Sequence, residues 1–231
     1  MKRFYKDVAA VAADGGFEIQ LDGRPVRTPA RAALILPNAR LAEAVAQEWR
    51  AQDDVVDPRS MPFTGLANGA IDQIEPNRQS FAAGIAQYGE SDLLCYRAEG
   101  PAELVAREAA AWDPLLGWAQ RRYDVMFRVT QGIIPVAQPA DTLERLGAVV
   151  AAYDAFTLAG LSTLVTLSGS LVCGLALVEG GQDPETVWAA SEIDEAWEME
   201  QWGEDAEATA RSALRGEEFL MAHDFCEFVR G

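Results

Sequence analysis

The chain has 231 residues, of which 49% are hydrophobic and 24% are charged, a composition typical of a globular protein that buries a core. Lysine and arginine number 19 against 36 aspartates and glutamates, giving a net charge of −17. Nucleic acids and anionic membranes bind clustered cations, so this charge argues against a nucleic-acid partner and against attachment to an anionic membrane surface.

Cysteine and histidine are scarce. The three cysteines, Cys95, Cys173 and Cys226, are far apart and show no CxxC spacing, and His223 is the single histidine. This usage argues against a disulfide framework and a zinc site, and it fits a reducing compartment. We expect Cys95, in an apolar strand, to be a small buried hydrophobe, and we expect no metal and no cofactor.

The first third of the chain has strand patterns. Residues 17–21 alternate apolar and polar, and Asp22-Gly23 follows with the conformational freedom that a tight turn needs. A return strand is predicted through Val26 and Thr28, with further strands at residues 3–8 and 33–36. After Pro37 a helix is predicted, with Asn38 as its N-cap, and it should cover one face of the small sheet.

From residue 77 onward helical patterns dominate. They cover residues 77–89, 101–122, 140–152, 184–202 and 204–229. Two strand-like pieces, 93–96 and 126–130, either pair with each other or join the first sheet. Because proline suits the first turn of a helix, Asp113-Pro114 predicts a corner between two helices.

These patterns predict an α+β fold with two domains. Residues 1–76 form a β-rich N-terminal domain with a covering helix, and residues 77–231 form a mainly α-helical C-terminal domain. Residues 155–178 carry no charge, but their serines, threonines and glycines and their acidic flanks favour a buried helix, or two short helices broken near Ser168-Gly169, over membrane insertion.

The acidity is concentrated in one segment. No lysine or arginine lies between Arg145 and Arg211, and residues 183–207 contain ten acids. On a helix, Asp194, Glu195 and Glu198 fall within an arc of about 100° that also contains Trp202. The opposite side carries an apolar stripe made of Ala189, Ala190, Ile193 and Trp197.

Three interpretations of this acidic face remain open. It is a solvated helix surface, a site for a divalent cation, or a docking face for a basic protein, since tryptophan is enriched at interface hot spots. Catalytic templates give no support for a nucleophile: the chain has no phosphate-binding loop, no GxGxxG and no GxSxG. No catalytic residue is predicted, and the alternative function is a carboxylate-based hydrolase or a divalent-metal-binding protein.

Eight short motifs, in order along nearly the whole chain, resemble one protein family. They are Lys2–Lys6 (KRFYK), Leu21–Pro29 (LDGRPVRTP), Ala46–Trp49 (AQEW), Met61–Thr64 (MPFT), Asp92–Arg97 (DLLCYR), Ala111–Leu116 (AWDPLL), Ser168–Leu171 (SGSL) and Gln201–Asp205 (QWGED). In these motifs the chain is similar to the "ATP-twelve" family, the assembly chaperones of the ATP synthase catalytic sector that act on the alpha subunit.

The resemblance implies a chaperone that is not an enzyme. Members bind the unassembled alpha subunit until the beta subunit replaces them, which protects an interface that would otherwise aggregate. We therefore expect the acidic face to dock this partner, and we expect a monomer when the protein is free. The expected docking residues are Asp194, Glu195, Glu198, Trp202, Glu204 and Asp205.

Two further expectations follow from the same motifs. Structural roles are predicted for Trp49 and Trp112, because each lies in a helix with apolar neighbours. Because the motifs begin at Lys2, the expected location is a bacterial cytoplasm, or the mitochondrial matrix if a transit peptide has been removed.

Overall fold

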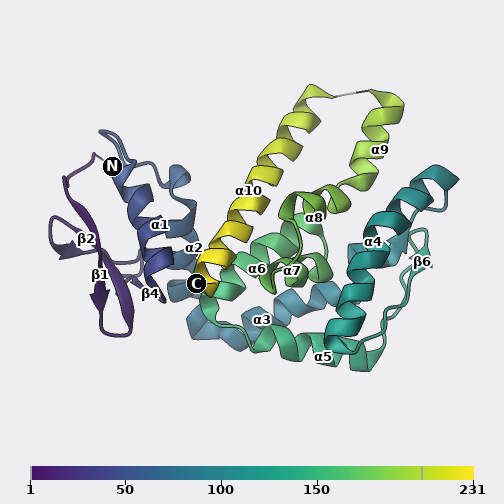
Figure 1. Cartoon of the computed structure of the whole chain (residues 1–231), viewed down its shortest axis with the longest axis horizontal. Helices are drawn as coiled ribbons and strands as arrows, with labels where there is room; N and C mark the ends of the chain where they lie inside the picture. Colours follow the sequence, from purple (N-terminus) through teal and green to yellow (C-terminus); the bar gives the residue numbers. More distant parts are fainter. Residues whose placement is uncertain (1, 204) are drawn as a thin grey trace. The chain divides into compact units, whose positions relative to one another are not determined.

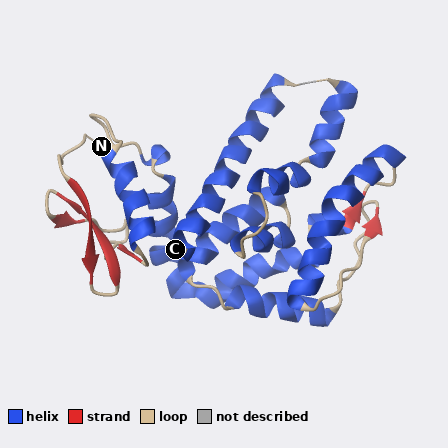
Figure 2. Ribbon diagram, in the orientation of Figure 1, coloured by secondary structure: helices blue, strands red, loops and turns tan. Residues whose placement is uncertain are grey.

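The computed structural model describes residues 2–203 and 205–231, and the chain forms two compact units (Figure 1). Unit 1 consists of Met1–Arg78, Asp154–Gly160 and Asp224–Gly231, and unit 2 consists of Gln79–Tyr153 and Leu161–His223. Two segments of unit 1 therefore come from the part of the sequence assigned above to the second domain. Strands are confined to short stretches and helices dominate, which confirms the predicted α+β class (Figure 2).

The sheet of unit 1 is antiparallel. Strands β1 (Val8–Ala13) and β2 (Gly16–Leu21) form a hairpin in which Val8 pairs with Leu21. Strands β3 (Arg24–Pro25) and β4 (Ile35–Leu36) both pair with β2, at its two ends. The predicted turn at Asp22-Gly23 is confirmed, since both residues have positive φ angles, of 50° and 75°.

The strand predicted at residues 3–8 was wrong, because the strand begins at Val8 and runs to Ala13. A second turn, at Asp14-Gly15, sets the register and pairs an alanine-rich segment with β2. The return strand is shorter than predicted: β3 ends at Pro25, the Val26 N–H still donates to the Ile19 carbonyl of β2 at 2.8 Å, and Thr28 does not pair with β2. Thr28 is buried beyond it, and its hydroxyl donates to Asp72 Oδ1 at 2.6 Å.

Helix α1 (Ala39–Arg50) packs against β1 and β2, as predicted. Asn38 is its N-cap, because its side-chain oxygen accepts a hydrogen bond from the Leu41 N–H at 2.9 Å. Leu41 and Val45 are fully buried against Ile19 and Leu36 in the core of this unit.

The rest of unit 1 begins with a short 3₁₀ turn and a helix. The turn η1 (Pro58–Ser60) is followed by α2 (Pro62–Gly69), a π turn η2 (Ala70–Ile74) and a 3₁₀ turn η3 (Glu75–Asn77). The carboxylate of Glu48 binds the first turn of α2, accepting from the N–H of Phe63 at 2.7 Å and of Thr64 at 2.8 Å.

The last residues of the chain complete unit 1. The ring of Phe63 lies 6.0 Å from that of Phe225 and 5.4 Å from that of Phe228, centroid to centroid. The Asn38 amide donates to the carbonyls of Phe228 and Val229, both at 2.9 Å. Unit 1 therefore buries side chains from segments that are far apart in the sequence.

Unit 2 is helical. It contains most of α3 (Arg78–Ala86), the 3₁₀ turns η4 (Gln87–Glu90) and η5 (Leu93–Cys95), α4 (Ala102–Tyr123), α5 (Ala140–Ala151), part of α6 (Ala155–Ser168), α7 (Leu171–Val178), α8 (Pro184–Ser191), α9 (Ile193–Trp202) and the larger part of α10 (Ala206–Arg230). Helix α7 is central, with Leu171–Leu177 all buried, and it packs against α4 and α8.

A buried carboxylate fixes the start of α7. Asp92 accepts hydrogen bonds from the Ser170 hydroxyl at 2.7 Å, the Val172 N–H at 3.0 Å and the Leu94 N–H at 3.1 Å. Burial raises the pKa of Asp92 to about 6, although these donors oppose the rise. Ser170 caps the same helix, because its hydroxyl oxygen accepts from the Cys173 N–H.

The uncharged stretch forms two helices, α6 and α7, separated at Gly169, whose φ is +67°. The predicted break near Ser168-Gly169 is thus confirmed. In the described part of the chain, no helix combines the length and the apolar character that crossing a membrane requires.

The corner predicted at Asp113-Pro114 was wrong, because α4 runs unbroken from Ala102 to Tyr123. Proline removes one helical hydrogen bond, but burial on both sides of Pro114 holds the helix: Trp112, Leu115 and Leu116 are all buried. Of the two strand-like pieces, only the ends pair with each other, in parallel, as β5 (Tyr96–Arg97) and β6 (Thr130–Gln131). The strand predicted over residues 93–95, which included Cys95, was wrong, because these residues form the 3₁₀ turn η5.

Candidate docking groove between α9 and α10

Helix α9 lies at the upper right of Figure 1, and the yellow-green helix α10 lies to its left. A groove of about 470 Å³ lies between them, within unit 2, and we call it the α9–α10 groove. It is lined by Glu192, Glu195, Ala196, Glu198, Met199, Trp202, Gly203, Asp205, Ala208, Arg211, Ser212 and Arg215.

Local sequence chemistry explains where the two helices end and begin. Helix α9 ends at Gly203, whose φ of +91° favours glycine. Asp205 starts α10, because its Oδ1 accepts from the N–H of Glu207 at 2.9 Å. Gly203 thus ends α9, and Asp205 caps the start of α10 two residues later.

The groove brings together four of the six residues predicted to bind a partner: Glu195, Glu198, Trp202 and Asp205. Glu204 lies outside the described residues. Asp194 lies in the first turn of the same helix but does not line the groove.

Asp194 lies instead beside Glu108 of α4. Glu108 is fully buried, and its two carboxylate oxygens accept from the Ala98 N–H at 3.1 and 3.0 Å. Burial raises the pKa of Glu108, and the adjacent Asp194 carboxyl raises it further, whereas Arg97 lowers it. Asp194 therefore lies on the side of α9 that packs against α4.

Two more contacts hold this side of α9. Arg107 of α4 forms a 2.7 Å ion pair with Glu200, and its guanidinium lies 4.8 Å from the ring centroid of Trp197. One side of α9 therefore contacts α4, and another side lines the groove.

The helix expected over residues 184–202 is two helices, α8 and α9, separated at Glu192. Glu192 is buried, and it accepts a 2.7 Å hydrogen bond from the Ser212 hydroxyl and forms a 3.3 Å ion pair with Arg215. These tertiary bonds give a reason for the break, which periodicity alone could not indicate.

The cations of the groove already have partners. Arg215 pairs with Glu192, and Arg211 pairs with Glu207 at 2.8 Å. Among the described residues, neither Glu195 nor Glu198 has a basic group within ion-pair distance, although both line the groove. The groove therefore presents negative charge that the chain itself leaves uncompensated.

The electrostatics of Glu195 favour a basic partner. Loss of solvent around the carboxyl raises the pKa of Glu195, and the neighbouring charges of Glu192 and Asp194 raise it further. Arg215 opposes this rise only in part. A cation brought in by a partner would relieve this repulsion.

Trp202 supplies the apolar part of the groove's rim. Its side chain is 87% exposed, which is unusual for the largest apolar side chain. Met199 and the small residues Ala196 and Ala208 extend the apolar lining. An exposed tryptophan beside uncompensated acids is the composition of a protein-docking surface.

Sequence reasoning missed the contribution of α10. Ala208, Arg211, Ser212 and Arg215 line the groove, but their spacing is that of any helix face. Only the antiparallel placement of α10 beside α9 brings them to the acids, and the sequence carried no signal of that placement.

A metal site or a hydrolase site finds no support in this arrangement. In the two described stretches of the chain, no group of three or more histidine, cysteine, aspartate or glutamate side chains could hold a metal ion.

Comparisons with known proteins agree on one family. The family model of the ATP12 chaperone proteins matches residues 2–120. The crystal structure of Atp12 from Paracoccus denitrificans is 42% identical, covering 99% of this chain and 98% of that one, with a TM-score of 0.95. A protein structure from Agrobacterium tumefaciens is 41% identical, covering 98% of this chain and 85% of that one, with a TM-score of 0.93.

A eukaryotic relative is more distant. The mitochondrial protein atp12 of Schizosaccharomyces pombe is 25% identical over 219 residues, which are 89% of this chain and 75% of that protein. The resemblance drawn from the eight sequence motifs is thereby confirmed. The chain belongs to the ATP12 family of chaperones, which serves the assembly of ATP synthase.

Proposed function

We propose that this chaperone binds the unassembled alpha subunit of ATP synthase through the α9–α10 groove and yields it to the beta subunit. It does so without catalytic turnover, in the compartment that holds the unassembled subunits, the cytoplasm of a bacterium. The observation that carries the proposal is the exposed Trp202 beside the uncompensated carboxylates of Glu195 and Glu198.

The chemistry of the groove suits a reversible complex. Clustered acids speed the encounter with a basic surface, and a single exposed aromatic supplies a compact apolar anchor. The buried area must stay moderate if the beta subunit is to displace the chaperone, since large apolar interfaces become permanent. The docking surface proposed is therefore Glu195, Glu198, Trp202 and Asp205, with Glu204 adjoining them in sequence.

Asp194 has a different part in this proposal. It positions α9 against Glu108 instead of touching the bound subunit. A substitution at Asp194 is accordingly expected to act through the stability of α9, and its effect on binding should follow its effect on the fold.

The test is capture of separately purified alpha and beta subunits. The protein should retain alpha but not beta, and adding beta should release alpha. Trp202→Ala and Glu195→Lys should each weaken capture of alpha by about tenfold or more, with an unchanged melting temperature.

Matched controls lie on α10 outside the groove. Leu214→Ala removes another exposed apolar side chain, and Glu217→Lys reverses another exposed charge. Both should bind alpha like the natural protein. Equal capture by all four variants would rule out the α9–α10 groove as the docking surface.

A further inference from the structure

Unit 1 contains a second groove, which the function proposed above does not use. It has a volume of about 340 Å³, within the range of sites that take ligands. Its apolar lining includes Trp49, Val56 and Met61, and α2 contributes Gly65 and Asn68. We call it the Trp49 groove.

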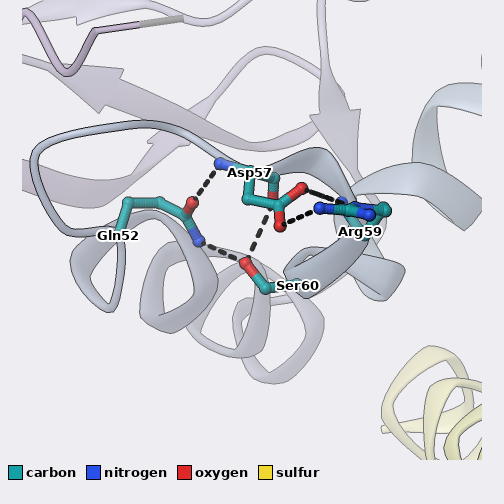
Figure 3. Close-up of polar contacts among 4 residues, drawn as sticks. All are labelled: Gln52, Asp57, Arg59 and Ser60. Carbon is teal, nitrogen blue, oxygen red and sulfur yellow. Dashed lines mark hydrogen bonds and ion pairs between the residues drawn. The ribbon is translucent and has the colours of Figure 1, made fainter.

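One wall of the Trp49 groove is a loop held by a buried amide (Figure 3). Gln52 accepts a hydrogen bond from the Asp57 N–H at 2.8 Å and donates one to Ser60 Oγ at 3.0 Å. Asp57 caps the turn that starts at Pro58 and binds the Arg59 side chain through both carboxylate oxygens, each at 3.2 Å. The loop that carries Val56 and Met61 is therefore fixed before any partner binds.

The opposite wall is fixed as well. Asp72 accepts from the Thr28 hydroxyl at 2.6 Å and from the Ala30 N–H at 2.9 Å, which holds the segment at the rim. Tyr5 donates to the Trp49 carbonyl at 2.8 Å, and the two rings lie 5.7 Å apart. These contacts give Trp49 the predicted structural role, but Trp49 also lines the groove.

The charge at the groove is opposite to that of the chain. The protein carries a net charge of −17, yet within the described residues no acidic side chain lines the Trp49 groove. Arg27 lines it, and its guanidinium donates to the Arg31 carbonyl at 3.0 Å and forms no ion pair within the described residues. A neighbouring hollow of about 660 Å³ shares Arg27 and Trp49 and adds Arg24 and Asp22.

We propose that the Trp49 groove binds a segment of the same alpha subunit, with an apolar side chain on Trp49 and Met61 and a carboxylate facing Arg27. The identity of this occupant rests on the proposed function, whereas its chemistry rests on the groove.

The test fills the groove from Gly65. This glycine is exposed on α2, and a Cβ built there meets nothing within 4 Å, so Gly65→Phe should fold and should occupy the groove. Gly84→Phe is the matched control, because Gly84 is also exposed on a helix with open space and lines neither groove. Arg27→Glu removes the cation, and Arg78→Glu is its control at an exposed arginine elsewhere in unit 1.

The measurement is the dissociation constant for purified alpha subunit. Gly65→Phe and Arg27→Glu should each raise it by about tenfold or more, and the controls should leave it within about twofold. A photoreactive p-benzoylphenylalanine at position 29, on the rim, should cross-link to one segment of alpha that carries an acidic residue.

Each outcome is decisive. If the natural protein binds alpha and both groove variants bind it equally well, the inference is wrong and the proposed function stands. If the natural protein fails to bind alpha, both are wrong. A cross-link to a segment without a carboxylate also contradicts the inference, even if Gly65→Phe fails to fold.

Discussion

The indole nitrogen of Trp112 donates a 2.6 Å hydrogen bond to the carbonyl of Ala190, and so joins the middle of α4 to the last turn of α8. Helix ends leave carbonyls without intrahelical partners, and Trp112 satisfies one of them inside the core. Arg97 covers the other side of the bond, since its guanidinium lies 4.9 Å from the ring centroid of Trp112.

Trp112→Phe should therefore destabilise unit 2 without changing its fold. The substitution keeps an aromatic ring but leaves the Ala190 carbonyl buried and unpaired, and it removes part of a side chain that is only 1% exposed. We expect the free energy of unfolding to fall by about 2–4 kcal/mol. Urea denaturation followed by circular dichroism measures this, and a loss below about 1 kcal/mol would show that the bond contributes little.

Asp92 should make stability depend on pH. Burial raises the pKa of Asp92 to about 6, from 3.8 in an unfolded chain. Its contribution to the free energy of unfolding is therefore complete below pH 3.8 and is lost as the pH rises through 6. Relative to Asp92→Asn, the natural protein should lose roughly 2 kcal/mol between about pH 4.5 and pH 7.5. Denaturant unfolding of both proteins at each pH gives the difference, and a constant difference would contradict the shift.

Glu108→Gln is expected to stabilise the protein at higher pH. The pKa of Glu108 is raised by burial and by Asp194, so the natural carboxyl loses stability as the pH rises above its unfolded value of 4.5. Glutamine keeps an acceptor for Ala98 and presents an amide donor to Asp194, as a protonated acid does. A gain of about 0.5–2 kcal/mol at pH 8, vanishing near pH 4, is the expected pattern in paired melting curves.

Gly174→Ala should destabilise α7 through steric conflict. A Cβ at this position would lie 2.5 Å from Val165 Cγ2 and 2.9 Å from Leu161 Cδ1. Alanine normally favours a helix, but here α6 and α7 must separate, so a loss of about 1–3 kcal/mol is expected. Gly147→Ala in α5, where a Cβ meets nothing within 4 Å, is the control and should be neutral or stabilising.

The three cysteines should resist alkylation in the folded protein. Cys95, Cys173 and Cys226 are buried, and burial raises the pKa of each thiol to about 12. Because the thiolate is the reactive form, iodoacetamide at pH 8 should modify none of them until denaturant is added. Mass spectrometry counts the labels, and rapid labelling of the native protein would reveal local opening.

Local chemistry made part of this fold predictable. Asn38 as a helix cap, Asp22-Gly23 as a turn and Gly169 as a break each depend on neighbours within four residues, and all three are found. The sequence could not reveal that Pro114 is tolerated in α4, because that depends on packing from α7, α8 and α9.

The candidate site was likewise predictable only where it depends on nearby residues, within α9. Glu195, Glu198 and Trp202 share a face because they follow helical spacing within α9, so periodicity found them. The sequence could not reveal that Asp194 lies beside Glu108, more than eighty residues earlier in the chain. The Trp49 groove gave no sequence signal, since its walls come from three separate segments.

The composition of unit 1 constrains the order in which the protein can mature on the ribosome. Phe225 and Phe228 pack on Phe63, and the carbonyls of Phe228 and Val229 bind Asn38, yet these C-terminal residues are translated only after all of unit 2. A nascent chain stalled before Asp224 must therefore expose the apolar side of α2. During most of its own synthesis, the core of unit 1 is therefore incomplete, and the chaperone itself exposes apolar surface of the kind that chaperones cover on other proteins.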